Sequence, residues 1–329
     1  MHFYRQNIPL FLEHNRVAVV IATHKMFPKL ERCLQSFRLL LPEPHDLVFV
    51  DNGSNENLCD WVAERFPKIT IIRLPKNSLF CGGYNEGIRV AMERGYKFVL
   101  ISNADTEVVN PYFLQELLEA ERRWPRGAFF GPQVLWRNSG IIQKTCLQFP
   151  NVFRRSWQWL PWHLNRKYFE KQSKEETTVD FLNGVCVLCR VAALKEIGLM
   201  DENMGGYVED ADWAWRAREK GWVTVFTPVP SVVHHETPSG YEQYSLKTFL
   251  LKRNTVLWFL KTGQKSSALS YAKLSIGLAW VRMMLEHSEE EKRKHRYFLK
   301  TLGRAYKGLL QGEKLGEWFG PPLGYWNNH

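Results

Sequence analysis

The sequence predicts an α/β fold in which helices flank a Rossmann-like, mostly parallel sheet, followed by a C-terminal helical region. Short apolar runs alternate with amphipathic stretches over the first 135 residues, which is the pattern of a parallel sheet covered by helices. Polar residues directly follow three of these runs, and beyond Tyr241 the apolar spacing is helical. The chain has 329 residues, 45% of them hydrophobic and 24% charged, a length that suggests one large domain with an appendage or two domains.

The first part of the chain carries the strand–helix alternation. The run VAVVIA at 17–22 predicts a buried strand, and the three- and four-residue apolar spacing from Leu30 to Phe37 predicts a helix. Pro111 is expected to open a later helix, because proline fits a first helical turn. The other elements are expected in the order strand 46–50, helix 57–66, strand 69–74, helix 83–94, strand 97–102 and strand 127–135.

The alternation breaks after Trp136, where residues 136–176 are expected to form an insertion or lid. This stretch carries Trp136, Trp157, Trp159 and Trp162 among basic residues. Strands are expected again at 177–189 and 222–226, with a helix at 209–221 and a loop to His234 and His235. Helices are expected at 245–261, 266–287 and 289–310. We therefore predict a sheet domain over 1–240 and a basic helical region over 241–329.

The cysteines and the N-terminal residues indicate which cellular compartment the sequence predicts for the protein. The N-terminal residues lack the long apolar stretch of a secretory signal, so reduced cysteines in a cytoplasmic protein are expected. Cys186 and Cys189 form a C-x-x-C pair, but no second pair follows at zinc spacing. Because residues three apart on a strand face opposite sides, we expect no metal or redox role for this pair.

The last quarter of the chain is strongly basic. From Tyr241 onward 15 Lys and Arg residues stand against 7 Asp and Glu residues, within a net charge of +10 for the chain. Such a tail favours an anionic membrane surface or an acidic polymer, and a solvated helix face explains it equally well. Lys273 and Arg282 interrupt the most apolar helix, so a spanning helix is not expected, whereas a core-packing or membrane-surface helix is.

Polar residues gather where three predicted strands end. They are Thr23-His24-Lys25, the Asp-Asn-Gly-Ser turn at 51–54, and Asn103-Ala104-Asp105. The carboxyl ends of parallel strands open onto one crevice, which is where ligands bind in such sheets. Each cluster alone is also ordinary turn chemistry, but together they favour a binding site.

The residue types suit a nucleotide-sugar site. Such a site needs groups for the base and ribose, oxygen ligands for a hard cation at the diphosphate, a base near the acceptor hydroxyl, and small residues beside the donor. The chain offers Thr23 and Asp51 for the base and ribose, Asp105 and His234 for the cation, Gly82, Gly83 and Asn85 for admitting the donor, and Glu209, Asp210 and Asp212 at a helix start. The structural alternatives are capping carboxylates, a glycine turn and a hydrogen-bonded loop histidine.

Seven segments, in order, resemble glycosyltransferase family 2, which has the glycosyltransferase A fold and inverts the anomeric centre. The segments are VVIATHK, VFVDNGS, NSLFCGGYNEG, LISNADTEV, FLNGVCVLCR, YVEDADWAWR and VVHH. The third and fourth particularly resemble the rhamnosyltransferase-like subgroup, which commonly uses dTDP-L-rhamnose in bacterial surface polysaccharide synthesis. The resemblance implies a dTDP- or UDP-sugar donor, a glycan or lipid-linked acceptor, a Mn²⁺ or Mg²⁺ cofactor and no nucleic-acid partner.

The same resemblance implies roles for individual residues. Asp210, beside Glu209, would be the catalytic base that takes the acceptor proton as its oxygen attacks C1 of the donor in line. Asp105 would bind the metal in a D-x-D-type motif whose first carboxylate is here Asn103, and His234 would join it. The donor-binding set would be Thr23, Lys25, Asp51, Asn52, Ser54, Asn77, Gly82, Gly83, Asn85, Asn103 and Ala104.

Other classes of protein compete with this interpretation. The main alternative is a catalytically weak carbohydrate-binding protein on a degenerate transferase fold, which the amide of Asn103 favours. A pyrophosphorylase is disfavoured because no Gly-rich loop follows VAVVIA, and a processive synthase because the Gln-x-x-Arg-Trp motif is missing. The region 241–329 is expected on the acceptor side, with peripheral contact to an anionic membrane. That contact is expected through Lys252, Arg253, Lys261, Lys265 and Lys273 among Phe249, Trp258 and Phe259.

Overall fold

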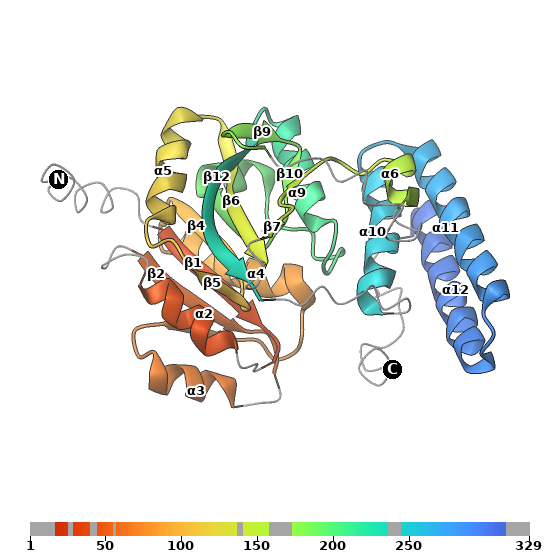
Figure 1. The fold of residues 1–329 in the computed structure, drawn as a ribbon, viewed down its shortest axis with the longest axis horizontal. Helices are drawn as coiled ribbons and strands as arrows, with labels where there is room; N and C mark the ends of the chain where they lie inside the picture. The colour runs from red at the N-terminus through yellow and green to blue at the C-terminus, as the bar shows by residue number, and fades with distance from the viewer. Residues whose placement is uncertain are drawn as a thin grey trace, which may run out of the picture. The chain divides into compact units, whose positions relative to one another are not determined.

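A ten-stranded mixed sheet forms the centre of the first of two compact units (Figure 1). The computed structural model describes residues 17–25, 29–39, 45–54, 57–136, 141–157, 173–235 and 245–313. The first unit comprises 1–148, 172–200 and 210–237, and the second comprises 149–171, 201–209 and 238–329.

The sheet of the first unit is mostly parallel, as predicted. Its strands are β1 (Val17–Thr23), β2 (His45–Asp51), β3 (Thr70–Arg73), β4 (Phe98–Asn103), β5 (Thr106–Val108), β6 (Gly127–Trp136), β7 (Ile142–Gln143), β9 (Thr177–Val179), β11 (Cys186–Arg190) and β12 (Val223–His234). The order is β3-β2-β1-β4-β11-β6-β12-β5, with β7 paired to β6 and β9 to β12. Strands β1 to β4 are parallel to one another and β6 is parallel to β12, whereas β11 and the short strands are antiparallel. A separate pair joins β8 (Cys146–Leu147) to β10 (Phe181–Leu182).

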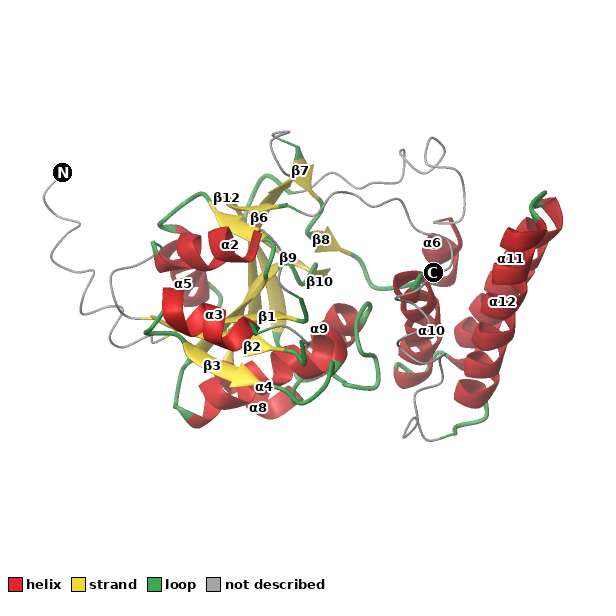
Figure 2. Ribbon diagram, turned by 90° about the horizontal axis from the view of Figure 1, so that it is seen from below, coloured by secondary structure: helices red, strands yellow, loops and turns green. Residues whose placement is uncertain are grey.

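Helices cover both faces of this sheet (Figure 2). One layer is α2 (Lys29–Arg38), α3 (Leu58–Arg65) and α5 (Phe113–Arg123), and the other is α4 (Leu79–Glu93), α8 (Val191–Ile197) and α9 (Glu209–Glu219). Because strand side chains alternate, Val19 and Ile21 of β1 join the core under the first layer, whereas Val20 faces α4. A Cβ at Gly87 would lie 2.3 Å from Val20, so glycine allows α4 to pack close to the sheet.

The strand register aligns the polar strand ends. Thr23 of β1 pairs with Asp51 of β2, and Ala22 pairs with Asn103 of β4. The amide of Asn52 donates to the carbonyl of Thr23 at 2.8 Å, which continues the pairing past the strand. The prediction that these three strands end at one edge is therefore confirmed.

The second unit is built from helices. They are α6 (Val152–Trp157), α10 (Leu246–Lys261), α11 (Lys265–Leu285) and α12 (Glu289–Leu310). Ser245 and Ser288 cap α10 and α12 by accepting from the amides of Thr248 and Glu291. The rings of Phe249 and Phe298 pack edge to face, with centroids 6.4 Å apart. In the part of the chain that the structure describes, no helix is both long and apolar enough to cross a bilayer.

Two predicted element boundaries are wrong. Helix α4 begins at Leu79, four residues before the predicted start, so Gly82 and Gly83 lie inside the helix instead of in a turn before it. Strand β12 continues through the predicted loop to His234, because register shifts around Pro230 accommodate prolines that have no N–H for the ladder.

Residues 149–171 and 201–209 group with the C-terminal helices in the second compact unit. Within the Trp-rich stretch, Trp136 ends β6 and Trp157 ends α6. Trp159 and Trp162 lie outside the described residues.

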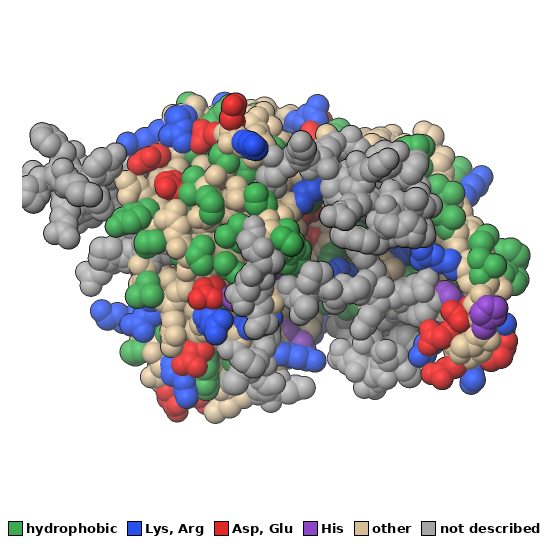
Figure 3. Space-filling model, viewed as in Figure 1, with side chains coloured by type: hydrophobic (Ala, Val, Ile, Leu, Met, Phe, Trp, Pro, Cys, Tyr) green, Lys and Arg blue, Asp and Glu red, His purple; other side chains and the backbone are tan. Residues whose placement is uncertain are grey.

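The residues predicted to meet a membrane are mostly interior, which corrects that assignment. Phe249, Trp258 and Phe259 are at most 1% exposed, and Arg253 is 2% exposed. Burial, together with the charge of Arg282, holds the pKa of Lys252 well below its usual value. The exposed apolar side chains of this unit instead lie mainly on α11 (Figure 3).

Cys186 and Cys189 lie on β11, and both are buried. Burial raises the pKa of the Cys186 thiol to about 12 and that of Cys189 further still. Thiolate chemistry is disfavoured at both positions, because a buried apolar site penalises the charged form.

We predict that Gly53→Ala destabilises the first unit more than Gly95→Ala. Both glycines have positive φ (70° and 75°), so alanine at either costs about 1 kcal/mol of backbone strain. A Cβ at Gly53 would also lie 2.1 Å from the carbonyl carbon of Lys76, whereas Gly95 faces open space. We expect Gly53→Ala to lower the free energy of unfolding, measured in urea, by about 1–3 kcal/mol more than Gly95→Ala does. Equal losses in the two variants would contradict the close approach of the two turns.

Candidate functional site

The pairing of β5 with β12 brings His234 to the turn that follows β4. His234 pairs with Thr106, so its side chain meets the Asn103-Ala104-Asp105 turn. His234 Nε2 lies 3.2 Å from Asp105 Oδ1 and 3.5 Å from Asn103 Nδ2. The amide of His235 donates to the carbonyl of Asp105 at 2.9 Å, which ties the two chain segments together. The structure thus brings together the two residues that the sequence predicts as metal ligands.

The ring of His234 is held in one orientation by two residues that sequence reasoning missed. Its Nδ1 lies 2.9 Å from Gln143 Oε1, and its ring stacks on Trp136 with centroids 5.6 Å apart. In the tautomer that donates from Nδ1 to this amide oxygen, the Nε2 lone pair faces the carboxylate of Asp105, and a cation can bind to both atoms. The donor set therefore fits a divalent cation.

The carboxylate of Asp105 is suited to a cation. Burial raises its pKa, but hydrogen bonds from His234 and its own backbone, with the charges of His234 and Lys29, lower the pKa overall. Among the described residues, no three His, Cys, Asp or Glu side chains gather into a closed metal site. A cation held by Asp105 and His234 would leave coordination positions for diphosphate oxygens and water.

His235 contacts a different carboxylate. Its Nε2 lies 2.7 Å from Glu107 Oε2, which Arg32 also approaches at 3.6 Å, and its carbonyl accepts from the Lys29 ammonium. The adjacent histidines therefore make separate contacts, His234 with Asp105 and His235 with Glu107, and the role of His234 as a metal ligand stays a prediction.

Asp51 organises the turn after β2. Its Oδ1 accepts from the Ser54 amide at 2.9 Å, and its Oδ2 lies 3.4 Å from Cys59 Sγ and 3.8 Å from Arg73 Nε. The side chain is fully buried, and Thr23 beside it donates its hydroxyl to the carbonyl of Lys25. The side chain of Lys25 is exposed. The predicted contact of Asp51 with a nucleobase stays a prediction.

Three of the predicted donor-binding residues shape the start of α4. Asn52 Oδ1 accepts from the amide and hydroxyl of Ser78, its Nδ2 donates to the carbonyl of Leu79, and Asn77 Oδ1 accepts from the Leu79 amide. A Cβ at Gly83 would lie 2.7 Å from Asn52 Nδ2, so glycine admits that side chain against the helix. Leu79 itself has φ 59°, a left-handed conformation that these bonds hold in place.

Asn85 joins α4 to the segment that ends at Met200. Its Nδ2 donates to the Met200 carbonyl at 2.9 Å, and its Oδ1 accepts from the Met200 amide at 3.1 Å. The side chain is 1% exposed. These two bonds account for a buried amide without a ligand, and its predicted contact with the donor stays a prediction.

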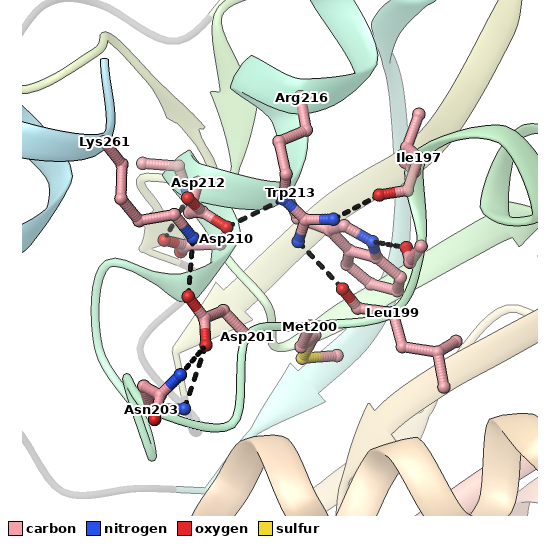
Figure 4. Close-up of polar contacts among 12 residues, drawn as sticks. Ile197, Leu199, Met200, Asp201, Asn203, Asp210, Asp212, Trp213, Arg216 and Lys261 are labelled. Carbon is pink, nitrogen blue, oxygen red and sulfur yellow. Dashed lines mark hydrogen bonds and ion pairs between the residues drawn. The ribbon is translucent and has the colours of Figure 1, made fainter. Parts of the chain in front are cut away.

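Helix α9 presents two aspartates with different surroundings (Figure 4). Asp212 bonds to Arg216 Nε at 2.9 Å, and the same guanidinium donates to the carbonyls of Ile197 and Leu199 at 2.5 Å and 2.8 Å. Asp210 is half-buried in the first turn, where its Oδ1 accepts from the Ala211 amide at 2.8 Å. Asp212 therefore anchors the helix, while Asp210 stands at its N-terminal end beside the buried Glu209.

Comparisons with known proteins agree with this fold. The family model described as "Glycosyl transferase family 2" matches residues 18–198, more than half of the chain. The N-acetylglucosaminyl-diphospho-decaprenol L-rhamnosyltransferase of Mycobacterium tuberculosis is 28% identical over 67% of this chain and 76% of its own length. The dTDP-rhamnosyl transferase RfbF of Shigella flexneri is 23% identical, over 67% and 69%. The crystal structure of S. aureus TarS 1-349 in complex with UDP-GlcNAc is 12% identical with TM-score 0.53, over 91% and 83%.

We predict that Gln143→Leu lowers Mn²⁺ affinity by about 10–100-fold, because the His234 ring loses the acceptor that fixes its orientation. Asp105→Asn should lower Mn²⁺ affinity further, since it removes a charged oxygen ligand. Free Mn²⁺ is measured by electron paramagnetic resonance with UDP or dTDP present. Glu107→Gln is the matched control, because Glu107 lies on the same short strand but contacts His235. Unchanged Mn²⁺ affinity in Gln143→Leu, or an equal loss of Mn²⁺ affinity in Glu107→Gln, would contradict the assignment of Asp105 and His234 as the metal ligands.

Proposed function

This chain belongs to glycosyltransferase family 2, and we propose that it transfers L-rhamnose from dTDP-rhamnose, with inversion, to a hydroxyl of a lipid-linked glycan. Its enzyme class, glycosyltransferase, follows from the family and fold. The donor and acceptor are supported by the two relatives, whose names specify rhamnosyl transfer and, in one case, a polyprenyl-diphosphate-linked N-acetylglucosamine.

The contact between Asp105 and His234 carries the proposal. A buried imidazole whose lone pair faces a carboxylate suits a divalent cation at the end of a nucleotide crevice. When bound, Mn²⁺ or Mg²⁺ would neutralise the charge that develops on the departing diphosphate. A protein that only binds carbohydrate has no need of a cation-binding pair at this position, which favours the enzyme over that alternative.

Asp210 is proposed as the base that accepts the proton of the attacking hydroxyl. It lies in the first turn of α9, where the helix dipole favours the ionised carboxylate that a base requires. Asp212 is tied to Arg216, and this ion pair suits an anchor better than a base. Thr23, Asp51 and the turn after it are proposed to receive the nucleoside, because the strand register places them at one sheet edge beside Asn103.

We predict that Asp210→Asn lowers kcat by about 10²–10⁴-fold while dTDP binding persists, because only proton acceptance is removed. The assay measures dTDP release from dTDP-rhamnose with a polyprenyl-diphospho-N-acetylglucosamine acceptor, and calorimetry measures dTDP binding. Asp212→Asn serves as the control: it should lower the melting temperature but leave kcat within about threefold in the folded enzyme. Near wild-type turnover in Asp210→Asn would refute the base assignment, and activity with UDP-sugars alone would refute the donor.

The second unit is proposed to meet an anionic membrane through α11. This helix is apolar on its buried side and also on its exposed side, which is unusual for a helix facing water. Exposed Trp280, Met284 and Leu285 are between 51% and 71% accessible. The helix carries basic residues at 265, 273 and 282 and has no Asp or Glu, so its charge complements anionic lipid. The division into a catalytic domain over 1–240 and an acceptor-side region over 241–329 remains part of this proposal.

We predict that Trp280→Ser combined with Leu285→Ser reduces co-flotation with phosphatidylglycerol vesicles by about tenfold or more, because two apolar anchors are lost. Leu39→Ser combined with Tyr112→Ser, at exposed apolar positions of the first unit, is the matched control and should float normally. Pure phosphatidylcholine vesicles should bind less. A concentration-dependent dimer that the α11 variant abolishes would instead assign this face to a second copy of the chain.

A further inference from the structure

We propose that Arg253 and Asn254 of α10 are positioning residues that hold the backbone of residues 203–208, from which the helix of the proposed catalytic base begins. This inference rests on the proposed function, because it concerns Asp210 as the base. Neither residue is among those predicted from the sequence for the site.

The segment before α9 has an unfavourable backbone conformation. Tyr207 and Val208 are consecutive residues other than glycine, and both have positive φ, 63° and 72°. A β-branched residue such as Val208 rarely adopts this region. Glu209 and Asp210 follow immediately, so the direction in which α9 starts is set by these two strained residues.

Asn254 and Arg253 supply the hydrogen bonds that hold this conformation. Asn254 Nδ2 lies 2.8 Å from the carbonyl oxygen of Met204, 2.7 Å from that of Gly206 and 2.8 Å from that of Tyr207. The Arg253 guanidinium donates to the carbonyls of Asn203 and Met204 at 2.5 Å and 3.0 Å. Arg253 Nε also donates to Asn254 Oδ1 at 2.9 Å, which orients the amide so that its N–H groups face the loop.

These contacts select a backbone geometry because their partners in the loop are carbonyl oxygens. Bonds to the carbonyls of residues 203, 204, 206 and 207 fix the peptide planes that contain them, and so the dihedral angles on either side of those planes. Arg253 and Asn254 are 2% and 0% exposed, so the bonds do not compete with water. An apolar pair could fill the same space but would not specify those planes.

One face of α10 makes further contacts with the same loop. Lys247 lies 5.7 Å from the centre of the Tyr207 ring, and Lys261 bonds to Asp201 at 2.6 Å. Asp201 in turn accepts from the amide and side chain of Asn203 (Figure 4). Lys247, Asn254 and Lys261 are spaced by seven residues, which places them on one side of the helix. The whole segment from Asp201 to Tyr207 is therefore bound along α10.

The expected consequence is a loss of turnover without a loss of donor binding. The base must lie within hydrogen-bonding reach of the acceptor hydroxyl, and misplacing a reacting group by about 1 Å costs about 100-fold in rate. The proposed donor residues at 23, 51, 103 and 105 belong to other elements, so donor affinity should persist.

The test compares Asn254→Ala and Arg253→Lys with Thr255→Val. Thr255 is buried on the same helix, but its hydroxyl bonds to Leu251 of that helix, so its loss measures general destabilisation. We expect Asn254→Ala to lower kcat by about 100-fold with dTDP-rhamnose KM within about threefold, and Thr255→Val to leave both nearly unchanged. Arg253→Lys should also lower kcat, because lysine keeps the charge but cannot donate from a planar fork. A parallel loss of donor affinity, or full activity in Asn254→Ala, would overturn the proposal.

Two further readouts separate this inference from the identity of the base. Hydrogen–deuterium exchange over 203–209 should rise in Asn254→Ala and not in Thr255→Val, whatever residue proves to be the base. Adding Tyr207→Gly to Asn254→Ala should recover part of the lost kcat, because glycine adopts positive φ without strain. Unchanged exchange, or no recovery with glycine, would overturn the positioning role. Normal turnover in Asp210→Asn alongside raised exchange in Asn254→Ala would refute Asp210 as the base. It would still support the role of Asn254 in holding residues 203–208.

Discussion

The structure depends on the pairing of β5 with β12, because that short ladder places Nε2 of His234 3.2 Å from the Asp105 carboxylate. Without it, a histidine at the end of one strand and an aspartate after another would be unrelated polar residues. Trp136 and Gln143 then fix the ring from two sides, so the site has a single preferred geometry before any ligand binds. Preorganisation of this kind is what a cation site needs, since reorienting a ligand on binding costs affinity.

Many polar residues near the strand ends also have a structural purpose. Asn52 and Asn77 cap the start of α4, and Asn85 fixes the same helix to Met200. Such residues hold the start of α4 in place even where they do not touch a ligand. Rigid strand ends beside a rigid helix start suit nucleotide recognition, because their backbone groups do not have to be ordered on binding.

The helical unit has buried polar side chains that its amino-acid composition does not reveal. Arg253 is predicted from the sequence to be part of a basic, membrane-facing surface, yet it and its neighbour Asn254 are buried against the loop that leads into α9. The exposed apolar surface is instead on α11, which has apolar residues on both sides and no acidic residue. The C-terminal region therefore combines two tasks in our proposal: α11 meets the lipid phase, and α10 shapes the start of the helix that carries the base.

The sequence by itself determined the strand–helix alternation, the three polar strand ends, the long C-terminal helices and the family, because these depend on local periodicity and on short motifs. Only the tertiary structure decided which side chains meet. Gln143 reaches His234 through a β6–β7 hairpin of two residue pairs, too short to leave a periodic signal, and Trp136 reaches it because β6 pairs with β12. The extension of β12 through Pro228 and Pro230 depends on neighbouring strands that tolerate a bulge. The burial of Arg253 and Asn254 follows from a partner loop some fifty residues earlier, which no local pattern encodes.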